Sequence, residues 1–380
     1  RIPYLFVGSL VAVLVMCLLP NAGSFGMAVS TAMIFGLVSL MFLDTSINMA
    51  MQPFKMMVGD MVNEKQKGLA YSIQSFLCNA GSLVGFLFPF IFTWIGISNI
   101  APQGVVPDSV IYSFYIGAAI LILCVIYTTV KVKEMPPAEY AEYHGITEEE
   151  KKEKINMVKL LVKAPKAFWT VGLVQFFCWF AFMFMWTYTN GSVAANVFDA
   201  PTIETVVNGA NKVVLDTKSI QYQNAADWVG VLFAVQAIGS VLWAVCIPMF
   251  KNRKLIYSLS LVLGGIGFIS TYFVHNQYVL FISFLLIGCA WAAMLALPFT
   301  ILTNALSGGH MGTYLGLFNG TICIPQIVAA TLGGSILALF TPKGMLPPEI
   351  NMLVMAGVML IIGAVCVYLI KETKGEQAKA

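Results

Sequence analysis

The stretch DTSINMAMQPFKMMVGD, residues 44–60, organises the rest of the chain. It begins inside a long apolar segment, with Asp44 directly after residues 35–43, and it runs out of that segment at its far end. A carboxylate deep in an apolar span costs several kcal/mol unless it is protonated or paired. We therefore expect Asp44 to serve a function; the alternative is an acid that only joins two helices.

Three further polar residues follow Asp44 on the same predicted helix. Asn48, Gln52 and Lys55 come four, eight and eleven residues later. At about 100° per residue, the four side chains share one face of roughly 80°. Such a stripe is expected to face a water-filled cavity or a bundle interior. Lys55 and Asp60 are predicted to form a charge network, and the alternative is a Lys55 that only reaches toward the membrane surface.

The composition predicts a polytopic membrane protein. Of the 380 residues, 59% are hydrophobic and only 10% are charged, whereas a soluble domain carries about 25% charged residues. The eight cysteines lie in apolar segments and are expected to be core residues. The three histidines are scattered, and no metal-binding spacing, phosphate loop or nucleophile motif occurs. We expect no enzyme activity, no cofactor, no metal and no nucleic-acid partner.

Ten segments have the length and hydropathy of membrane spans. They are residues 3–19, 26–51, 69–95, 110–130, 167–190, 226–250, 255–274, 278–304, 312–340 and 350–370. Pro298 and Pro325 lie inside the eighth and ninth spans, where kinks are expected. Alternating these spans places 18 of the 21 Lys and Arg residues on one side. That side is predicted to be cytoplasmic, with both termini on it, in the cell membrane.

The chain divides into two halves that resemble each other weakly. We expect an N-terminal half over residues 1–131, a cytoplasmic linker over 132–166 and a C-terminal half over 167–380. The motif QPF at 52–54 is followed by a helix opening at Gly68, and LPF at 297–299 by one at Gly312. A helix that lies along the membrane surface is expected after Thr147, and the alternative is a plain solvated linker. The polar loop 191–225 receives no structural assignment.

Three sequence patches resemble a known family. They are residues 44–60, WFAFMFMWTYTNG at 179–191 and GLFNGTICIPQ at 316–326. They are similar to the fourth, seventh and eleventh helices of sucrose/maltose-type proton symporters, a branch of the major facilitator superfamily near the glycoside–pentoside–hexuronide symporters. The basic hairpin KNRK at 251–254 is also typical of that superfamily. Arg1 resembles the remnant of an equivalent hairpin, which implies that about 10 of 12 helices are present.

The resemblance implies a fold and a set of site residues. The fold is an all-α membrane protein, a major facilitator bundle with two pseudo-repeated helical halves. Asp44 takes the proton-coupling role by its position. The residues expected to bind substrate are Asn48, Gln52, Gln175, Trp179, Trp186, Asn190, Trp291, Asn319 and Gln326.

One departure from the family concerns the aromatic residues. Plant members carry two acids near the end of the seventh helix, where this chain has Trp186 and Tyr188. Gln175, Trp179 and Trp186 share one helical face with Phe182. Tryptophan rings stack on the C–H face of a sugar ring, so this face is expected to bind sugar. The alternative is an aromatic belt at the membrane boundary.

The function implied is import of a disaccharide, sucrose or an α-glucoside such as maltose, by proton symport with alternating access. The predicted partners are a small sugar, protons and the lipid bilayer, and a monomer is expected. Sodium coupling remains an alternative, as does a non-transporting sugar sensor on the same fold. The linker of about 35 residues favours transport over sensing, and no channel filter sequence occurs.

Overall fold

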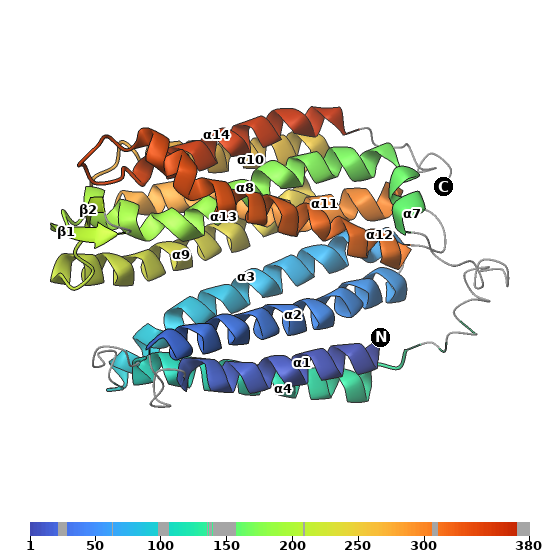
Figure 1. The fold of residues 1–380 in the computed structure, drawn as a ribbon. Helices are drawn as coiled ribbons and strands as arrows, with labels where there is room; N and C mark the ends of the chain where they lie inside the picture. Colours follow the sequence, from blue (N-terminus) through green and yellow to red (C-terminus); the bar gives the residue numbers. More distant parts are fainter. Residues whose placement is uncertain are drawn as a thin grey trace. The chain divides into compact units, whose positions relative to one another are not determined.

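The computed structural model describes residues 1–21, 29–62, 64–97, 106–134, 136, 139, 157–207, 210–305 and 311–370. Within them the protein is almost entirely helical, with a single two-stranded sheet (Figure 1). Nine described helical segments are long and apolar enough to cross a membrane. The third predicted span, residues 69–95, lies in a further helix, α3 (Glu64–Trp94).

The chain divides into two compact units. The first unit comprises Arg1–Lys67 and Val84–Ile155, and the second comprises Gly68–Leu83 and Asn156–Ala380. Helix α3 therefore contributes its middle part to the second unit. The domain boundaries given above remain a prediction.

The first unit is built around α1 (Ile2–Leu18), which packs against α2 (Val29–Met61) and α4 (Asp108–Lys131). Leu5, Ala50 and Val125 form its buried centre, one residue from each helix. The short 3₁₀ turn η1 (Leu19–Asn21) ends α1. There the side-chain amide of Asn21 donates to the hydroxyl of Tyr115 at 2.8 Å, which ties α1 to α4.

The whole polar stripe, from Asp44 to Lys55, lies on helix α2. It contains Pro53 and continues to Met61, whereas the predicted span ended at residue 51. The hydrophobic stretch therefore ends before the helix does. Asp44, Asn48, Gln52 and Lys55 keep the helical spacing that the sequence predicts.

The second unit is organised around α8 (Lys166–Asn196). This helix contacts α9 (Ile220–Cys246), α11 (Leu280–Ala305), α13 (Gly320–Phe340) and α14 (Ile350–Cys366). Helix α10 (Arg253–Ser270) packs between α11 and α14 (Figure 1). The core contains fully buried phenylalanines: Phe168, Phe182, Phe184, Phe268, Phe284 and Phe318. The short turns η2 (Ile247–Met249) and η3 (Val367–Leu369) end α9 and α14.

The seam between α10 and α14 depends on two glycines. A Cβ atom added to Gly265 would lie 2.9 Å from the carbonyl oxygen of Gly357. A Cβ atom added to Gly357 would lie 2.7 Å from the carbonyl oxygen of Gly265. The two backbones therefore approach too closely for any larger residue, as small residues allow in membrane helix pairs.

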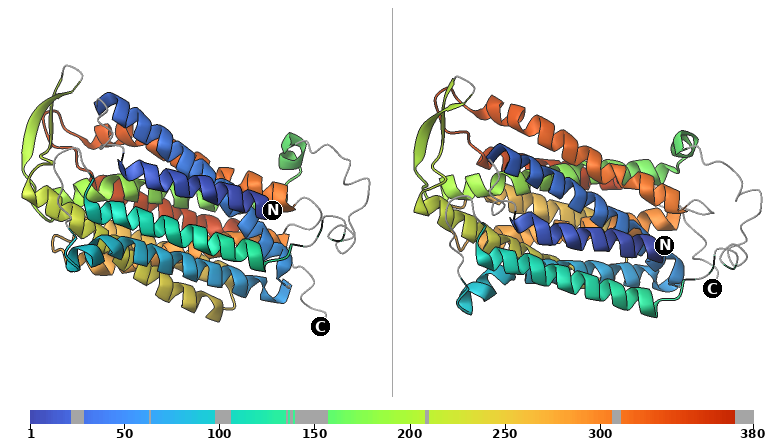
Figure 2. Two further views of the ribbon diagram at one scale, coloured as in Figure 1. Left: turned by 90° about the horizontal axis from the view of Figure 1, so that it is seen from below. Right: turned by 60° about the horizontal axis from the view of Figure 1, so that its bottom comes forward.

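A β-hairpin joins α8 to α9. Strand β1 (Thr202–Val207) pairs antiparallel with β2 (Ala210–Leu215), and Thr202 lies opposite Leu215. The backbone N–H of Asp216 donates to the carbonyl of Pro201 at 2.8 Å and closes the base of the hairpin. Figure 2 shows the hairpin at the end of the second unit from which α9 begins. Much of the segment 191–225, for which the sequence predicts no structure, is thus the end of α8, the hairpin and the start of α9.

The ninth predicted span is two helices. Helix α12 (Met311–Phe318) is followed by α13, with Asn319 as the residue between them. Pro325 lies inside α13, so the break comes before the proline rather than at it. In the linker, α7 (Met157–Val162) is a short helix. The helix start predicted at Thr147 lies outside the described residues.

Candidate functional site

Three tryptophans from two helices of the second unit meet. Trp179 and Trp186 come from α8, and Trp291 comes from α11. The ring centroids of Trp291 lie 5.8 Å from those of both Trp179 and Trp186, with interplanar angles of 77° and 82°. We call these three residues the tryptophan cluster. The edge-to-face arrangement is one that aromatic rings favour energetically.

Phe182 completes the aromatic face. Its ring centroid lies 4.9 Å from that of Trp291 and 6.4 Å from that of Trp186. The exposure of the cluster is graded along α8, because Trp179 is 9% exposed and Trp186 is 44% exposed. The cluster therefore has a buried end and an open end on the same face.

Gln175 lies one helical turn below Trp179 and connects α8 to α11. Its side-chain amide donates to the Met294 carbonyl at 3.1 Å. That carbonyl is four residues before Pro298, which has no N–H to donate to it within the helix. Gln175 therefore supplies a donor where the proline removes one. This contact holds α8 and α11 together beside the cluster.

Two buried polar atoms of these residues have no protein partner in the described part of the chain. They are the side-chain oxygen Oε1 of Gln175 and the indole Nε1 of Trp179. One is an acceptor and the other is a donor. Buried polar groups are normally hydrogen-bonded, so unpaired ones at an aromatic face indicate a place for a polar ligand or water. The arrangement suits a molecule with hydroxyl groups and an apolar face.

The polar stripe of α2 belongs to the first unit. Asp44 is exposed, and its carboxylate accepts a hydrogen bond from the Asn48 side-chain amide at 3.2 Å. The same amide donates to the Asp44 backbone carbonyl at 2.9 Å. Gln52 and Lys55 are half-buried. Asp60 lies in the last turn of α2, and its side chain falls outside the described part of the structure.

Three further predicted residues, Asn190, Asn319 and Gln326, have other surroundings among the described residues. The side-chain amide of Asn190 donates to the hydroxyl of Tyr222 at 2.9 Å, at the hairpin end of α8. Asn319 lies at the start of α13, and its amide lies 3.9 Å from the sulfur of Cys323. Gln326 is half-buried on α13. Ring contacts thus join Trp179, Trp186 and Trp291, and Gln175 lies one turn before Trp179 on α8.

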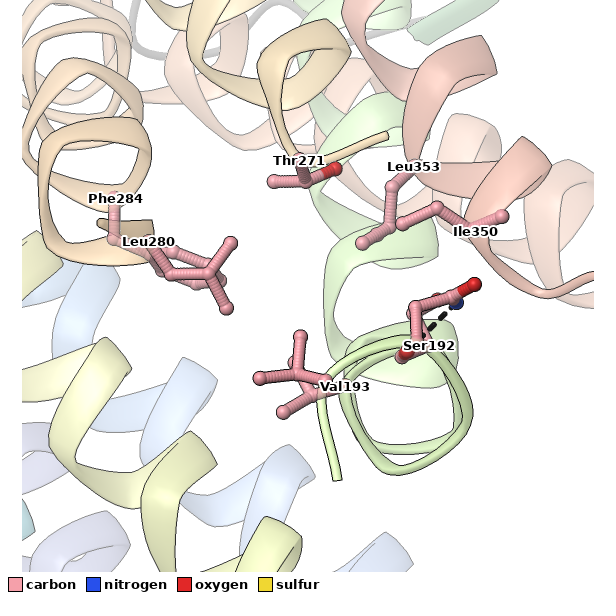
Figure 3. Close-up of a pocket in the computed structure, with 9 residues that line it drawn as sticks. Ser192, Val193, Thr271, Leu280, Phe284, Ile350 and Leu353 are labelled. Atoms are coloured by element: carbon pink, nitrogen blue, oxygen red, sulfur yellow. Dashed lines mark hydrogen bonds between the residues drawn. The ribbon is translucent and has the colours of Figure 1, made fainter. Parts of the chain in front are cut away.

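A small apolar pocket lies near this hairpin end, between α8, α10, α11 and α14. Figure 3 shows Val193, Thr271, Leu280 and Leu353 directed toward one another there. Its volume is about 10 Å³, roughly the least that one water molecule needs. This pocket is a packing gap rather than a ligand site.

One acidic residue of interest was not predicted. Glu349 precedes α14, and the sequence marks it only as an acid after Pro347 and Pro348. It lies against Gly191 of α8, because a Cβ atom at Gly191 would overlap the Glu349 carboxylate. Burial raises the pKa of the Glu349 carboxyl to about 7. Only the fold brings these two residues together, since they are far apart in sequence.

Comparison with known proteins gives a consistent fold. The sequence model of the Major Facilitator Superfamily matches residues 193–380. No curated protein sequence matches the chain closely enough to count as a relative.

Solved structures of two sugar symporters resemble the chain. A variant of the E. coli fucose:proton symporter FucP has a TM-score of 0.65 and 13% identity, covering 98% of this chain and 84% of its own. The proton:xylose symporter XylE bound to 6-bromo-6-deoxy-D-glucose has a TM-score of 0.65 and 12% identity, covering 98% and 81%. Inward-open XylE from E. coli has a TM-score of 0.61 and 14% identity, covering 99% and 80%. The chain is therefore a multi-pass membrane protein with the major facilitator fold, as the sequence predicts.

Proposed function

We propose that this protein is a secondary active transporter that imports a disaccharide, sucrose or an α-glucoside such as maltose, together with a proton. The sugar binds at the tryptophan cluster and the proton at Asp44. The two sites alternate in access to the two sides of the membrane during the cycle.

The observation that carries the proposal is the tryptophan cluster with its two unpartnered polar atoms. A sugar ring presents C–H groups on its faces and hydroxyls at its rim. The indole rings offer a flat apolar surface to the C–H groups. Gln175 Oε1 offers an acceptor to the sugar hydroxyls, and Trp179 Nε1 offers them a donor. A purely structural cluster would gain nothing from two buried atoms without partners.

Asp44 supports the coupling part of the proposal. It is a carboxylate inside the long apolar helix α2, and its one recorded side-chain partner among the described residues is the neutral amide of Asn48. A carboxylate with a neutral partner can gain and lose a proton without breaking an ion pair. A neutral sugar carries no charge of its own, so a proton on Asp44 would link its uptake to the proton gradient.

The fold comparison is compatible with this proposal. The chain shares its fold with FucP and XylE, which are described as a fucose:proton symporter and a proton:xylose symporter. At 12–13% identity the likeness is one of fold, so the disaccharide is inferred from the tryptophan cluster and from the resemblance of residues 44–60, 179–191 and 316–326 to sucrose/maltose-type symporters.

The test is uptake by the full-length protein in vesicles with an imposed pH gradient. Labelled sucrose and maltose would be compared in wild type, Asp44→Asn and Asp108→Asn. Asp108 is an exposed acid at the start of α4, so its variant is a matched control. We expect gradient-driven accumulation in wild type and in the control, and only binding or exchange in Asp44→Asn.

Three results would contradict parts of the proposal. Uptake that follows a sodium gradient instead would show that sodium, and not a proton, is the coupling ion. Saturable binding without any movement of sugar would indicate a sensor. Equal accumulation by wild type and Asp44→Asn would remove Asp44 from the mechanism.

A further inference from the structure

A polar hollow lies within the second unit, and none of the three tryptophans of the cluster is among the residues that line it. It has a volume of about 320 Å³ and lies between the end of α8, strand β2, the start of α9 and the segment before α14. Figure 1 shows the hairpin and these helix ends at one end of the unit. The distribution of Lys and Arg predicts that this end is external. We call it the hairpin hollow.

The hairpin hollow has two kinds of wall. The polar residues that line it are Thr187, Asn190, Thr217, Tyr222 and Glu349. The apolar residues that line it are Val214, Leu215, Leu346 and Pro347. Among the described residues that line it there is no lysine or arginine, so they offer an anionic ligand no counter-charge.

Asn190 brings an unpaired acceptor to the hollow. Its amide nitrogen is occupied, because it donates to the Tyr222 hydroxyl at 2.9 Å. Its oxygen Oδ1 is buried and has no partner among the described residues. Tyr222 accepts that bond and keeps its own hydroxyl proton available. The pair therefore presents one acceptor and one donor.

Glu349 brings further acceptors. Its carboxylate lies against Gly191, and the absence of a side chain at Gly191 makes the space that it occupies. No hydrogen bond to this carboxylate is found in the described part of the protein. Together with Asn190 Oδ1, the hollow thus holds acceptors that only an occupant or water can satisfy.

The two walls decide which occupant fits. A metal or ammonium ion would use the oxygen atoms but not the apolar wall. A molecule with a hydroxyl rim and a C–H face would use both. The volume lies at the lower end of the range of ligand sites, roughly 300–1,000 Å³, which favours one sugar ring over two.

We propose that the hairpin hollow binds a small uncharged polyhydroxy compound of monosaccharide size, at a site distinct from the tryptophan cluster. Asn190, Tyr222 and Glu349 bind its hydroxyls, and Leu346 and Pro347 contact its C–H face. The proposal does not depend on the transport function.

The test is fluorine NMR of the full-length protein in nanodiscs, with its tyrosines replaced by 3-fluorotyrosine. The Tyr222 resonance is identified by its loss in Tyr222→Phe. D-glucose is the probe, and choline chloride is the cationic comparison. We expect a saturable glucose-dependent shift of the Tyr222 resonance. Asn190→Leu should weaken the apparent affinity about tenfold, the upper end of what one hydrogen bond contributes.

Two further variants make the result decisive. At pH 8, above the Glu349 pKa of about 7, the carboxyl is mostly ionised. Glu349→Gln keeps the shape of the site and should then also weaken glucose binding about tenfold, because a hydrogen bond to a charged acceptor is stronger. Trp291→Phe alters the tryptophan cluster and should leave the shift unchanged. The proposal is overturned if glucose gives no shift, if only choline does, if both hollow variants match wild type, or if Trp291→Phe abolishes the shift. The glucose titration does not require transport. The proposal of a sugar site in the hairpin hollow and the proposal of sugar transport can therefore fail independently.

Discussion

The side-chain nitrogen of Gln175 lies 3.1 Å from the carbonyl oxygen of Met294, the carbonyl whose helical partner position is occupied by Pro298. A proline inside a membrane helix frees a carbonyl, and neighbouring helices commonly satisfy it. Here the neighbour is α8, and the same contact fixes the height at which Trp179 meets Trp291. The proline in α11 and the glutamine in α8 therefore act together, because one frees a carbonyl and the other donates to it.

Replacing Gln175 should therefore destabilise the protein, because the Met294 carbonyl loses its hydrogen-bond donor. We expect Gln175→Met to lower the free energy of unfolding by about 1–3 kcal/mol, because a buried carbonyl loses its donor. Pro298→Ala restores a helical N–H, so the loss should be much smaller in that background. Thermal unfolding of the four proteins in detergent measures the cycle. Equal losses in both backgrounds would show that Gln175 acts elsewhere.

Trp291 should contribute more to sugar binding than a tryptophan outside the cluster does. We expect Trp291→Ala to weaken binding of the transported sugar about tenfold, roughly 1.4 kcal/mol, through loss of its aromatic surface. Trp169→Ala is the control, because Trp169 is 52% exposed on the same helix α8 and outside the cluster. Equilibrium binding of labelled sucrose and maltose measures both. Similar losses in the two variants would argue against a sugar site at the cluster.

Gly191→Ala should be accommodated only if the Glu349 side chain moves. The added Cβ atom would overlap the Glu349 carboxylate, which is the far end of a flexible side chain, so its displacement should destabilise the protein by only about 1 kcal/mol. In a Glu349→Ala background the overlap disappears, and alanine favours the helix over glycine by about 1 kcal/mol. The same substitution should then be neutral or stabilising. Unfolding midpoints of the single and double variants test this reversal of sign.

Glu349 should also make stability depend on pH. Burial raises its pKa to about 7, whereas the unfolded chain releases this proton near pH 4.5. Between these values the folded state binds more protons, so stability falls as pH rises from about 4.5 to 7. The full effect is about 3 kcal/mol.

The measurement is the unfolding midpoint at pH 5 and pH 8, in wild type and Glu349→Gln. Glutamine does not titrate, so the variant should lose the part of the pH dependence that Glu349 contributes. Among the residues lining the hairpin hollow, Glu349 alone has a group that titrates in this window. A variant with the same pH dependence as wild type would show that another group is responsible.

The membrane helices were predictable because their signal is local. Twenty apolar residues in succession specify a span wherever they occur, and each of the ten predicted spans overlaps helical structure. The ends were less predictable. Helix α2 runs past its apolar stretch to Met61, since backbone hydrogen bonds continue where hydropathy stops. The break at Asn319 comes one turn and a half before Pro325, the residue that signalled it.

The hairpin has a local sequence signal that hydropathy over the length of a membrane span does not detect. Residues 202–207 and 210–215 are rich in valine, isoleucine and threonine, and the dipeptide between them is Asn-Gly, typical of a tight hairpin turn.

The site was predictable only along one helix. The spacing of Gln175, Trp179 and Trp186 predicts a common face on α8, and the structure confirms that they share one. The contact with Trp291 and that of Glu349 with Gly191 join residues from separate helices, which no local spacing encodes. Asn190 was assigned to the sugar site by its place on α8, yet its bond to Tyr222 turns it toward the hairpin. Its role at the tryptophan cluster remains a prediction.

The glycine seam between α10 and α14 has a practical consequence for spectroscopy. Where Gly265 and Gly357 meet, each glycine lies against the backbone carbonyl of the other helix, so the two helices have little room to slide. Spin labels on the outward faces of α10 and α14 should therefore report one narrow distance in every ligand condition. That pair would act as an internal ruler against which the motion of any other helix in the protein can be measured.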